Sequence, residues 1–178
     1  MDYEPIVYIE DIEAISHEEW LQARRTGIGG SDAGVIMEAS HFRTPRELWE
    51  DKCGFMPPEN DANWLQKQFG TYLEELVARV FQRETGYQVF AMRKMFQHPH
   101  HPFMLADVDY FVQLPTGKTF ILECKTCGVD QLESQWGRPN DTKIPAAYTW
   151  QCRHYMTVCN LDGAFICCLA ANSMQYFR

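Results

Sequence analysis

The stretch that decides the fold is LADVDYFV at residues 105–112, followed after a turn by FILECK at residues 120–125. We interpret the two runs as strands of one hairpin, because both are mostly apolar and a Pro-Thr-Gly turn separates them. Side chains alternate between the two faces of a strand, so Glu123 and Lys125 point the same way. Asp107 and Asp109 share one face of the partner strand for the same reason.

Ionisable groups on a mostly apolar strand are costly to bury unless their charge is compensated. A divalent cation is the natural compensation, since Mg²⁺ prefers oxygen ligands and needs only a few carboxylates plus water. A lysine beside the cation can hold or deprotonate an attacking water. The pattern therefore predicts metal-dependent phosphodiester cleavage, with Asp109 favoured over Asp107 as the acid that faces Glu123. The alternative is an edge strand whose acids are simply solvated.

Caps and hydrophobic periodicity place the other elements. Helices are predicted to start at Ser16, at Ser31 (over residues 33–38), at Thr44, at residue 63 and at Pro145. Strands are predicted at residues 87–96, 103–112, 119–125 and 164–170. This mixture predicts an α/β fold with a mixed β-sheet flanked by helices. Residues 1–15 are expected to be a peripheral N-terminal segment, and residues 16–178 a single domain.

The overall composition narrows the class of protein. A formal net charge of −8 argues against a protein that coats nucleic acid through its total charge, although a nuclease with local basic contacts fits. The seven cysteines are irregularly spaced, and we find neither a signal peptide nor an apolar run of membrane length. We therefore expect reduced thiols, no membrane association and a cytoplasmic location. Zinc is disfavoured, because no second cluster matches Cys124 and Cys127 or the loop histidines.

Three further groups are candidates for a functional site. Glu74 falls at the edge of the apolar stripe of the longest predicted helix, and is either a structural boundary residue or an additional metal ligand. Residues 27–32 form a glycine-rich turn before a helix, where backbone N–H groups can bind phosphate. Arg24 and Arg25 lie beside this turn, and guanidinium groups match phosphate geometry. Gln151 lies on the helix that starts at Pro145 and is a candidate to meet the metal site or DNA, although a glutamine on a helix is usually uninformative.

Taken in order, these pieces resemble the YqaJ-type viral recombinase family, relatives of phage lambda exonuclease within the PD-(D/E)xK nuclease superfamily. Each motif alone is weak, whereas several in the right order are specific. The resemblance runs from about residue 17 to residue 171. The matching pieces are Trp20, Arg24 to Asp32, Thr44-Pro45, Leu48-Trp49, Lys52 to Gly54, Gly70 to Glu74, Asp109, Glu123 to Thr126, Ile144-Pro145, Tyr148 and Gln151. One departure is that Val108-Asp109-Tyr110 replaces the Pro-Asp-Gly common in the family.

The resemblance implies a restriction-endonuclease-like core and assigns roles to some of the matching positions. The catalytic set would be Glu74, Asp109, Glu123, Lys125 and Gln151. Glu74, Asp109 and Glu123 would bind the metal, and Lys125 would be the catalytic lysine. Ser31 would hold the DNA phosphate together with an arginine, either Arg24 or Arg25.

The function implied is that of a Mg²⁺- or Mn²⁺-dependent deoxyribonuclease, a 5′→3′ exonuclease on double-stranded DNA in phage-type recombination. Family relatives also imply a homo-trimer, a single-strand annealing protein as partner, and a bacterial or phage-infected cytoplasm. One alternative is a structure-selective or restriction-like endonuclease on the same fold. Another is a non-catalytic DNA-binding module, which the complete Asp–Glu-x-Lys set argues against.

Overall fold

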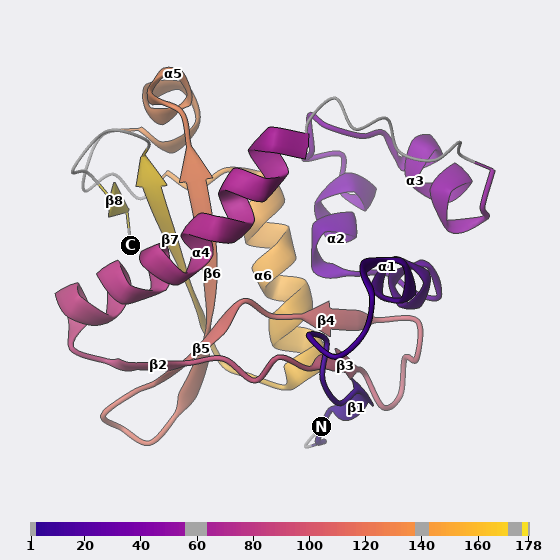
Figure 1. Ribbon diagram of the computed structural model, residues 1–178, viewed down its shortest axis with the longest axis horizontal. Coiled ribbons are helices and arrows are strands. Elements are labelled where there is room, and N and C mark those ends of the chain that lie inside the picture. Colours follow the sequence, from indigo (N-terminus) through magenta and orange to yellow (C-terminus); the bar gives the residue numbers. More distant parts are fainter. Residues whose placement is uncertain (1–2, 56–63, 138–142, 171–175, 178) are drawn as a thin grey trace. The chain divides into compact units, whose positions relative to one another are not determined.

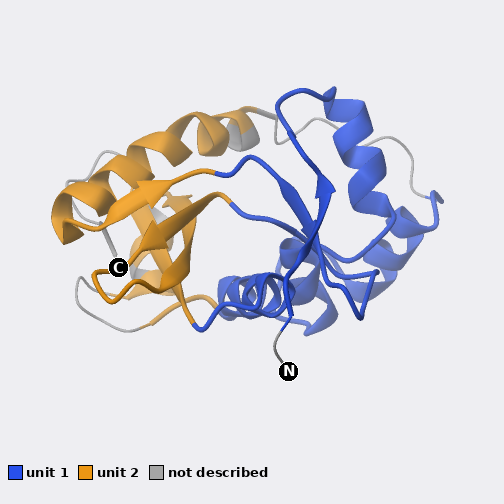
Figure 2. Cartoon of the chain, turned by 90° about the horizontal axis from the view of Figure 1, so that it is seen from below, with its two compact units in different colours: residues 1–59, 92–108, 146–162 blue, residues 60–91, 109–145, 163–178 orange. Residues whose placement is uncertain are grey.

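The structure is a computed structural model, and it describes residues 3–55, 64–137, 143–170 and 176–177. Contacts within the chain gather into two compact units, each assembled from three segments of the sequence (Figure 2). Unit 1 comprises residues 1–59, 92–108 and 146–162, and unit 2 comprises residues 60–91, 109–145 and 163–178. Each unit therefore depends on contacts between residues far apart in the chain, and the single domain expected for residues 16–178 stays a prediction.

Unit 1 combines a small sheet with helices (Figure 1). Its antiparallel strands, in the order β1-β3-β4, are β1 (Ile6–Ile9), β3 (Met95–Gln97) and β4 (Leu105–Asp107). Its helices are α1 (His17–Arg25), α2 (Gly30–Ile36), α3 (Pro45–Lys52) and α6 (Ala146–Cys159). The segment predicted as peripheral thus contributes a strand. Alternation gave no sign of it, because the four residues of β1 are all apolar or aromatic. The strand pairs with β3 through its backbone.

The helix starts in unit 1 follow the capping rules, with one exception. Ser16 and Glu19 form the predicted capping box of α1, and Thr44 and Glu47 form that of α3. The prediction that Ser31 caps α2 is wrong, because the helix already begins at Gly30. The carboxylate of Asp32 accepts the N–H of Gly29 at 2.8 Å and closes this end of the helix instead.

Unit 2 is a five-stranded sheet with a long helix across one face (Figure 1). In the order β2-β5-β6-β7-β8, its strands are β2 (Gln88–Phe90), β5 (Tyr110–Gln113), β6 (Thr119–Cys127), β7 (Ala164–Ala170) and β8 (Tyr176–Phe177). Only the β6–β7 pair is parallel. The helices are α4 (Trp64–Thr85), a short α5 (Val129–Gln131) and a π-helical turn, η2 (Leu132–Trp136).

Helix α4 supplies the apolar side of the core of unit 2. Its buried residues Val77, Ala78 and Phe81 pack against inward residues of the sheet, which include Leu122 and Cys124 of β6. Side chains alternate along β6, so Glu123 and Lys125 lie on the face of the strand opposite to Cys124. The packing of α4 thereby fixes which side chains of β6 are left for chemistry.

Two of the predicted strands are each divided in the structure. Residues 87–96 become β2 and β3, and residues 103–112 become β4 and β5. In both cases the two halves belong to different sheets. The hairpin that pairs β5 with β6 is confirmed, and its turn closes through the N–H of Gly117 bonded to the carbonyl of Leu114 at 2.9 Å. Alternating apolar residues indicate an extended chain, but they do not indicate where the chain changes its pairing partner.

Candidate active site

A buried ion pair lies in the middle of β6. The side chain of Glu123 is 1% exposed, and its Oε1 bonds the amine of Lys125, whose side chain is 21% exposed. The two residues share a face of the strand, as predicted. The carboxylate is thus withdrawn from water while the lysine keeps a partial path to solvent. This arrangement is typical of a site where a buried charge is retained for chemistry.

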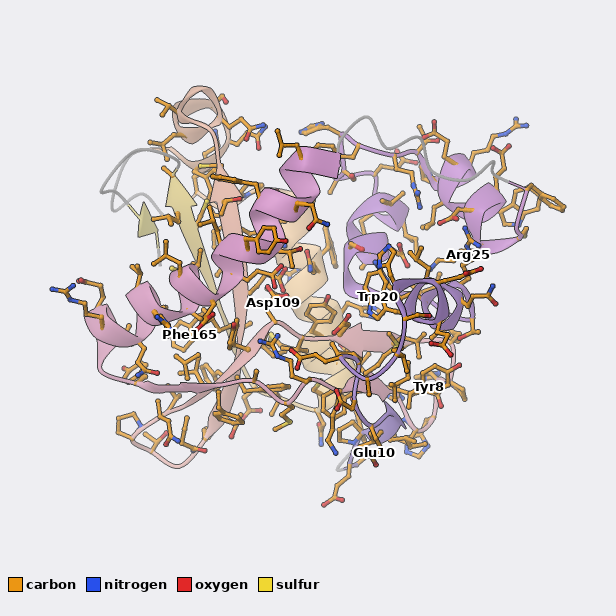
Figure 3. The ribbon with its side chains drawn as sticks, viewed as in Figure 1. Tyr8, Glu10, Trp20, Arg25, Asp109 and Phe165 are labelled. Atoms are coloured by element: carbon orange, nitrogen blue, oxygen red, sulfur yellow. The ribbon has the colours of Figure 1, made fainter. Side chains whose placement is uncertain are left out.

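Asp109 stands directly before β5 and reaches the same part of β6 (Figure 3). Its Oδ2 accepts the N–H of Cys124 at 2.8 Å. The register pairs Tyr110 with Leu122, so continuing it by one residue sets Asp109 opposite Glu123. The hairpin therefore brings together the two acids and the lysine that the sequence singled out.

The thiol of Cys124 is buried near several negative charges in this part of β6. Burial raises its pKa most, and the negative charges of Asp109, Glu123 and Glu74 raise the pKa further. Glu74 is half-buried on α4, whereas its neighbour Glu75 is exposed. The structure thus places Glu74 at the edge of the buried face of α4, as predicted, and electrostatically close to β6.

Asp107 has different surroundings, although it is only two residues from Asp109. It ends β4 in unit 1, where its Oδ2 accepts the indole N–H of Trp20 at 2.8 Å. Burial raises the pKa of this carboxyl group, and the bond from Trp20 partly offsets the rise. The interruption of the strand between β4 and β5 therefore separates two acids that share one face in the predicted strand.

The donor set around β6 suits a hard cation. Asp109 and Glu123 offer carboxylate oxygens, which are the ligands that Mg²⁺ and Mn²⁺ prefer. Among the residues that the structure describes, no group of three or more His, Cys, Asp or Glu side chains is gathered as a ready-made metal site. Mg²⁺ needs only one or two carboxylates plus water and substrate phosphate, so the pair fits it. Glu74 as a third ligand stays a prediction.

Unit 1 brings one of the two adjacent arginines to the serine. The Arg24 guanidinium donates to the hydroxyl of Ser31 at 2.8 Å and lies over the Trp20 ring, 4.7 Å from its centroid. Arg25 instead pairs with Asp51 of α3 at 3.5 Å, and Figure 3 labels it on the side of α1 toward that helix. The sequence left the choice between the arginines open, and the geometry joins Arg24 to Ser31.

Gln151 is buried on α6 in unit 1, where its amide nitrogen donates to the Tyr155 hydroxyl at 3.3 Å. A Cβ on Gly30 would lie 2.3 Å from the Tyr155 ring and 3.0 Å from Gln151 Cγ, so only glycine allows this close packing of α2 on α6. The contact explains one glycine of the 27–32 turn by packing. The catalytic role expected for Gln151 stays a prediction.

Sequence reasoning placed Lys52 in a piece that matches the family but gave no role to this charged residue near the arginines. Lys52 pairs with Asp32 at 2.8 Å, and both side chains are largely buried. A lysine in the last turn of a helix is ordinary, because it complements the helix dipole. Only its tertiary contacts distinguish Lys52 from such a residue.

Comparison with known proteins gives one family match and one curated relative. The family model described as "YqaJ-like viral recombinase domain" matches residues 19–162. The chain is 39% identical over 144 residues to the uncharacterized protein YqaJ of Bacillus subtilis (strain 168). That match covers 81% of this chain but only 43% of YqaJ, so the chain spans less than half of that relative.

Two solved structures share the fold. An alkaline exonuclease from Laribacter hongkongensis, LHK-Exo, matches with a TM-score of 0.63 and 21% identity. The same exonuclease in complex with dAMP matches with a TM-score of 0.63 and 22% identity. Each match covers 90% of this chain and 79% of the other. They confirm the predicted mixed α/β, restriction-endonuclease-like fold. Separately, no helix in the described part of the chain is both long and apolar enough to span a membrane.

Proposed function

This chain belongs to the family of YqaJ-like viral recombinase domains, and on that premise we propose that it is a DNA exonuclease. In its specific form, it hydrolyses double-stranded DNA from the 5′ end with the help of Mg²⁺ or Mn²⁺. One observation carries the proposal: a fully buried glutamate, Glu123, shares a strand face with a lysine and lies opposite Asp109. A sheet has no structural need for such charges, which makes a chemical role the better explanation.

The metal-binding part of the proposal rests on the carboxylates. Asp109 and Glu123 would hold the cation, and the family resemblance adds Glu74 of α4 as a third ligand. Once bound, such a cation favours formation of the nucleophile from water and stabilises negative charge on the phosphate. The hydrogen bond from Cys124 N–H to Asp109 holds that carboxylate in place before any ligand arrives, which reduces the cost of assembling the site.

Lys125 would handle the proton of the attacking water. Its amine is oriented by Glu123 on the same face of β6 and keeps partial access to solvent. A lysine held this way can orient a water molecule by hydrogen bonding, and it can accept that water's proton as the phosphorus–oxygen bond forms once its ammonium group has released a proton to solvent. The leaving 3′ oxygen then takes a proton from solvent.

Arg24 and Ser31 would bind a terminal 5′ phosphate. The guanidinium already meets the hydroxyl, and both groups can donate to phosphate oxygens. A terminal phosphate carries nearly two negative charges and an internal phosphodiester only one, so a cationic pocket can discriminate between them. Such discrimination is what an exonuclease needs.

Assembly and partners follow from the family alone. We propose a homo-trimer, a single-strand annealing protein as partner and a cytoplasmic setting. The expected role of Gln151 near the reacting phosphate has the same support.

The test is digestion of linear duplex carrying a 5′-phosphate, the same duplex carrying a 5′-hydroxyl, and closed circular duplex, with Mg²⁺ or with EDTA. We expect the phosphorylated linear duplex to be degraded fastest, the circle to survive, and EDTA to stop the reaction. If closed circles are cut as fast as linear duplex, the protein is an endonuclease and not an exonuclease. If digestion continues in EDTA, the reaction does not depend on a divalent metal.

A further inference from the structure

We propose that Lys52 is a positioning residue that makes the Arg24–Ser31 pocket selective for a terminal phosphate. It acts by neutralising Asp32, so that the positive charge of Arg24 is left for the ligand. The inference rests on the proposed function, because it assumes that this pocket receives the 5′ end of DNA. It concerns a residue to which neither the motifs nor the site around β6 gives a role.

The contacts of Lys52 connect three helices. Its amine pairs with Asp32 Oδ2 of α2 at 2.8 Å and donates to the backbone carbonyl of Arg24, at the end of α1, also at 2.8 Å. The lysine itself comes from the last turn of α3. Its side chain is 16% exposed and that of Asp32 is 8% exposed. Water therefore screens this pair weakly, and its charges act strongly on their neighbours.

The negative charge of Asp32 opposes the binding of a phosphate in this pocket. It follows Ser31 directly in the chain, and its Oδ2 is fixed by the N–H of Gly29 at 2.8 Å. A carboxylate so close to the serine would repel phosphate and cancel the charge of Arg24. With Lys52 in place, the three ionised side chains keep one net positive charge, and without it they are neutral.

Helix α3 also explains why Arg24, and not Arg25, serves the pocket. Asp51 precedes Lys52 and binds Arg25 at 3.5 Å and Arg43 at 2.9 Å. Arg25 is therefore drawn toward α3, while Arg24 is stacked on Trp20 and directed to Ser31. Asp51 thus holds the side chain of Arg25, while the next residue, Lys52, contacts the backbone of Arg24 and pairs with Asp32.

A purely structural role for Lys52 makes a different prediction. If Lys52 and Asp32 only held the helices together, loss of either would weaken the pocket. If charge compensation is the role, the two substitutions act in opposite directions. Lys52→Met should weaken phosphate binding, whereas Asp32→Asn should strengthen it, because asparagine keeps an oxygen for the Gly29 N–H and loses the negative charge.

The experiment measures binding without catalysis. Short duplexes that differ only in a 5′-phosphate or 5′-hydroxyl are titrated in EDTA at low salt, with fluorescence anisotropy as readout. We expect Lys52→Met to weaken binding of the phosphorylated duplex about tenfold, with little change for the hydroxyl duplex. Asp32→Asn should bind the phosphorylated duplex at least as tightly as the wild type. The double variant, Lys52→Met with Asp32→Asn, should recover most of the preference for the phosphorylated duplex that Lys52→Met loses.

The matched control is Lys94→Met, which removes another ion-paired lysine of unit 1, bound to Glu10 at 2.6 Å on the exposed surface. It should keep the wild-type preference. The inference is overturned if Lys52→Met keeps that preference, or if Asp32→Asn and the double variant lose it as well. The double variant carries the test if Lys52→Met does not fold. A wild type that shows the binding pattern but cuts no DNA would refute the proposed function only.

Discussion

Among the described residues, each unit contains a lysine–carboxylate pair that is largely withdrawn from water, and the two pairs are built differently. Lys52 and Asp32 in unit 1 come from different helices, and backbone groups of Gly29 and Arg24 take part in their bonds. Glu123 and Lys125 in unit 2 stand two residues apart on one strand. The first pair joins two helices, α2 and α3, whereas the second joins two residues of a single strand.

The comparison shows that a buried ion pair can be retained for structural reasons or for a chemical role. Desolvating an ion pair costs several kcal/mol per ion, and good geometry with further hydrogen bonds must offset it. The N–H of Gly29 bonds Asp32, and the carbonyl of Arg24 accepts a bond from Lys52, so this pair has such hydrogen bonds. For Glu123 and Lys125, a role in binding a cation and a water gives a reason to retain the charges. Variants of each pair therefore probe different properties: activity in unit 2, and ligand selectivity or stability in unit 1.

The largest effect is expected from the acids beside β6. Asp109→Asn or Glu123→Gln should lower Mg²⁺-dependent digestion by about a thousandfold or more, because a neutral amide no longer attracts the cation. Both changes preserve side-chain shape, and asparagine still accepts the N–H of Cys124, so circular dichroism should report an intact fold. The control is Asp107→Asn, which should stay within a few-fold of wild type. Near-normal digestion by Asp109→Asn would reject the site.

Loss of the lysine in the same pair should be somewhat milder. Lys125→Met should lower the rate at saturating DNA by roughly a hundredfold to ten-thousandfold, the usual contribution of a group that transfers a proton. DNA affinity in EDTA should change little, because the amine acts mainly in the transition state. A variant that binds poorly but cleaves at the normal rate when saturated would assign Lys125 to DNA binding instead.

The two arginines test the same distinction inside unit 1. Arg24→Gln should reduce the preference for 5′-phosphorylated over 5′-hydroxyl duplex about tenfold, since it removes the guanidinium that meets Ser31. Arg25→Gln should keep the preference within about twofold, because Asp51 already engages that side chain. Initial rates on the two duplexes give the ratio directly. If Arg25→Gln loses more of the preference than Arg24→Gln, then Arg25 is the residue that contacts the phosphate.

The smallest effect concerns stability and pH. Burial raises the pKa of Asp107, so the folded state disfavours its charged form. This destabilisation is absent at pH values well below 3.8, the ordinary pKa of an aspartate, and complete once the pH exceeds the raised pKa of the folded state. Asp107→Asn keeps an acceptor for Trp20 and should raise the free energy of unfolding at neutral pH by about 1 kcal/mol. The gain should disappear as the pH falls. Urea titrations across the acid range measure it, and a gain independent of pH would contradict this cause.

The amino-acid sequence by itself determined the local parts of this protein. The caps at Ser16 and Thr44 rest on bonds between residues three positions apart, and the β5–β6 hairpin is defined by its turn. Strand parity alone put Glu123 and Lys125 on one face. Helical periodicity alone set Glu74 at the margin of the α4 core. Each of these follows from residues close together in the chain, whose geometry is set by the backbone.

Only the tertiary structure decided the rest. It divided residues 103–112 between two sheets and so separated Asp107 from Asp109. It also gave Arg24 to Ser31 and Arg25 to Asp51, and brought Lys52 to Asp32. Strand partners and ion pairs depend on segments that are distant in sequence. The alternation and the charges along one segment are the same whichever segment it packs against, so they do not identify its partner. The sequence therefore predicted which residues of one segment share a face better than it predicted their partners from distant segments.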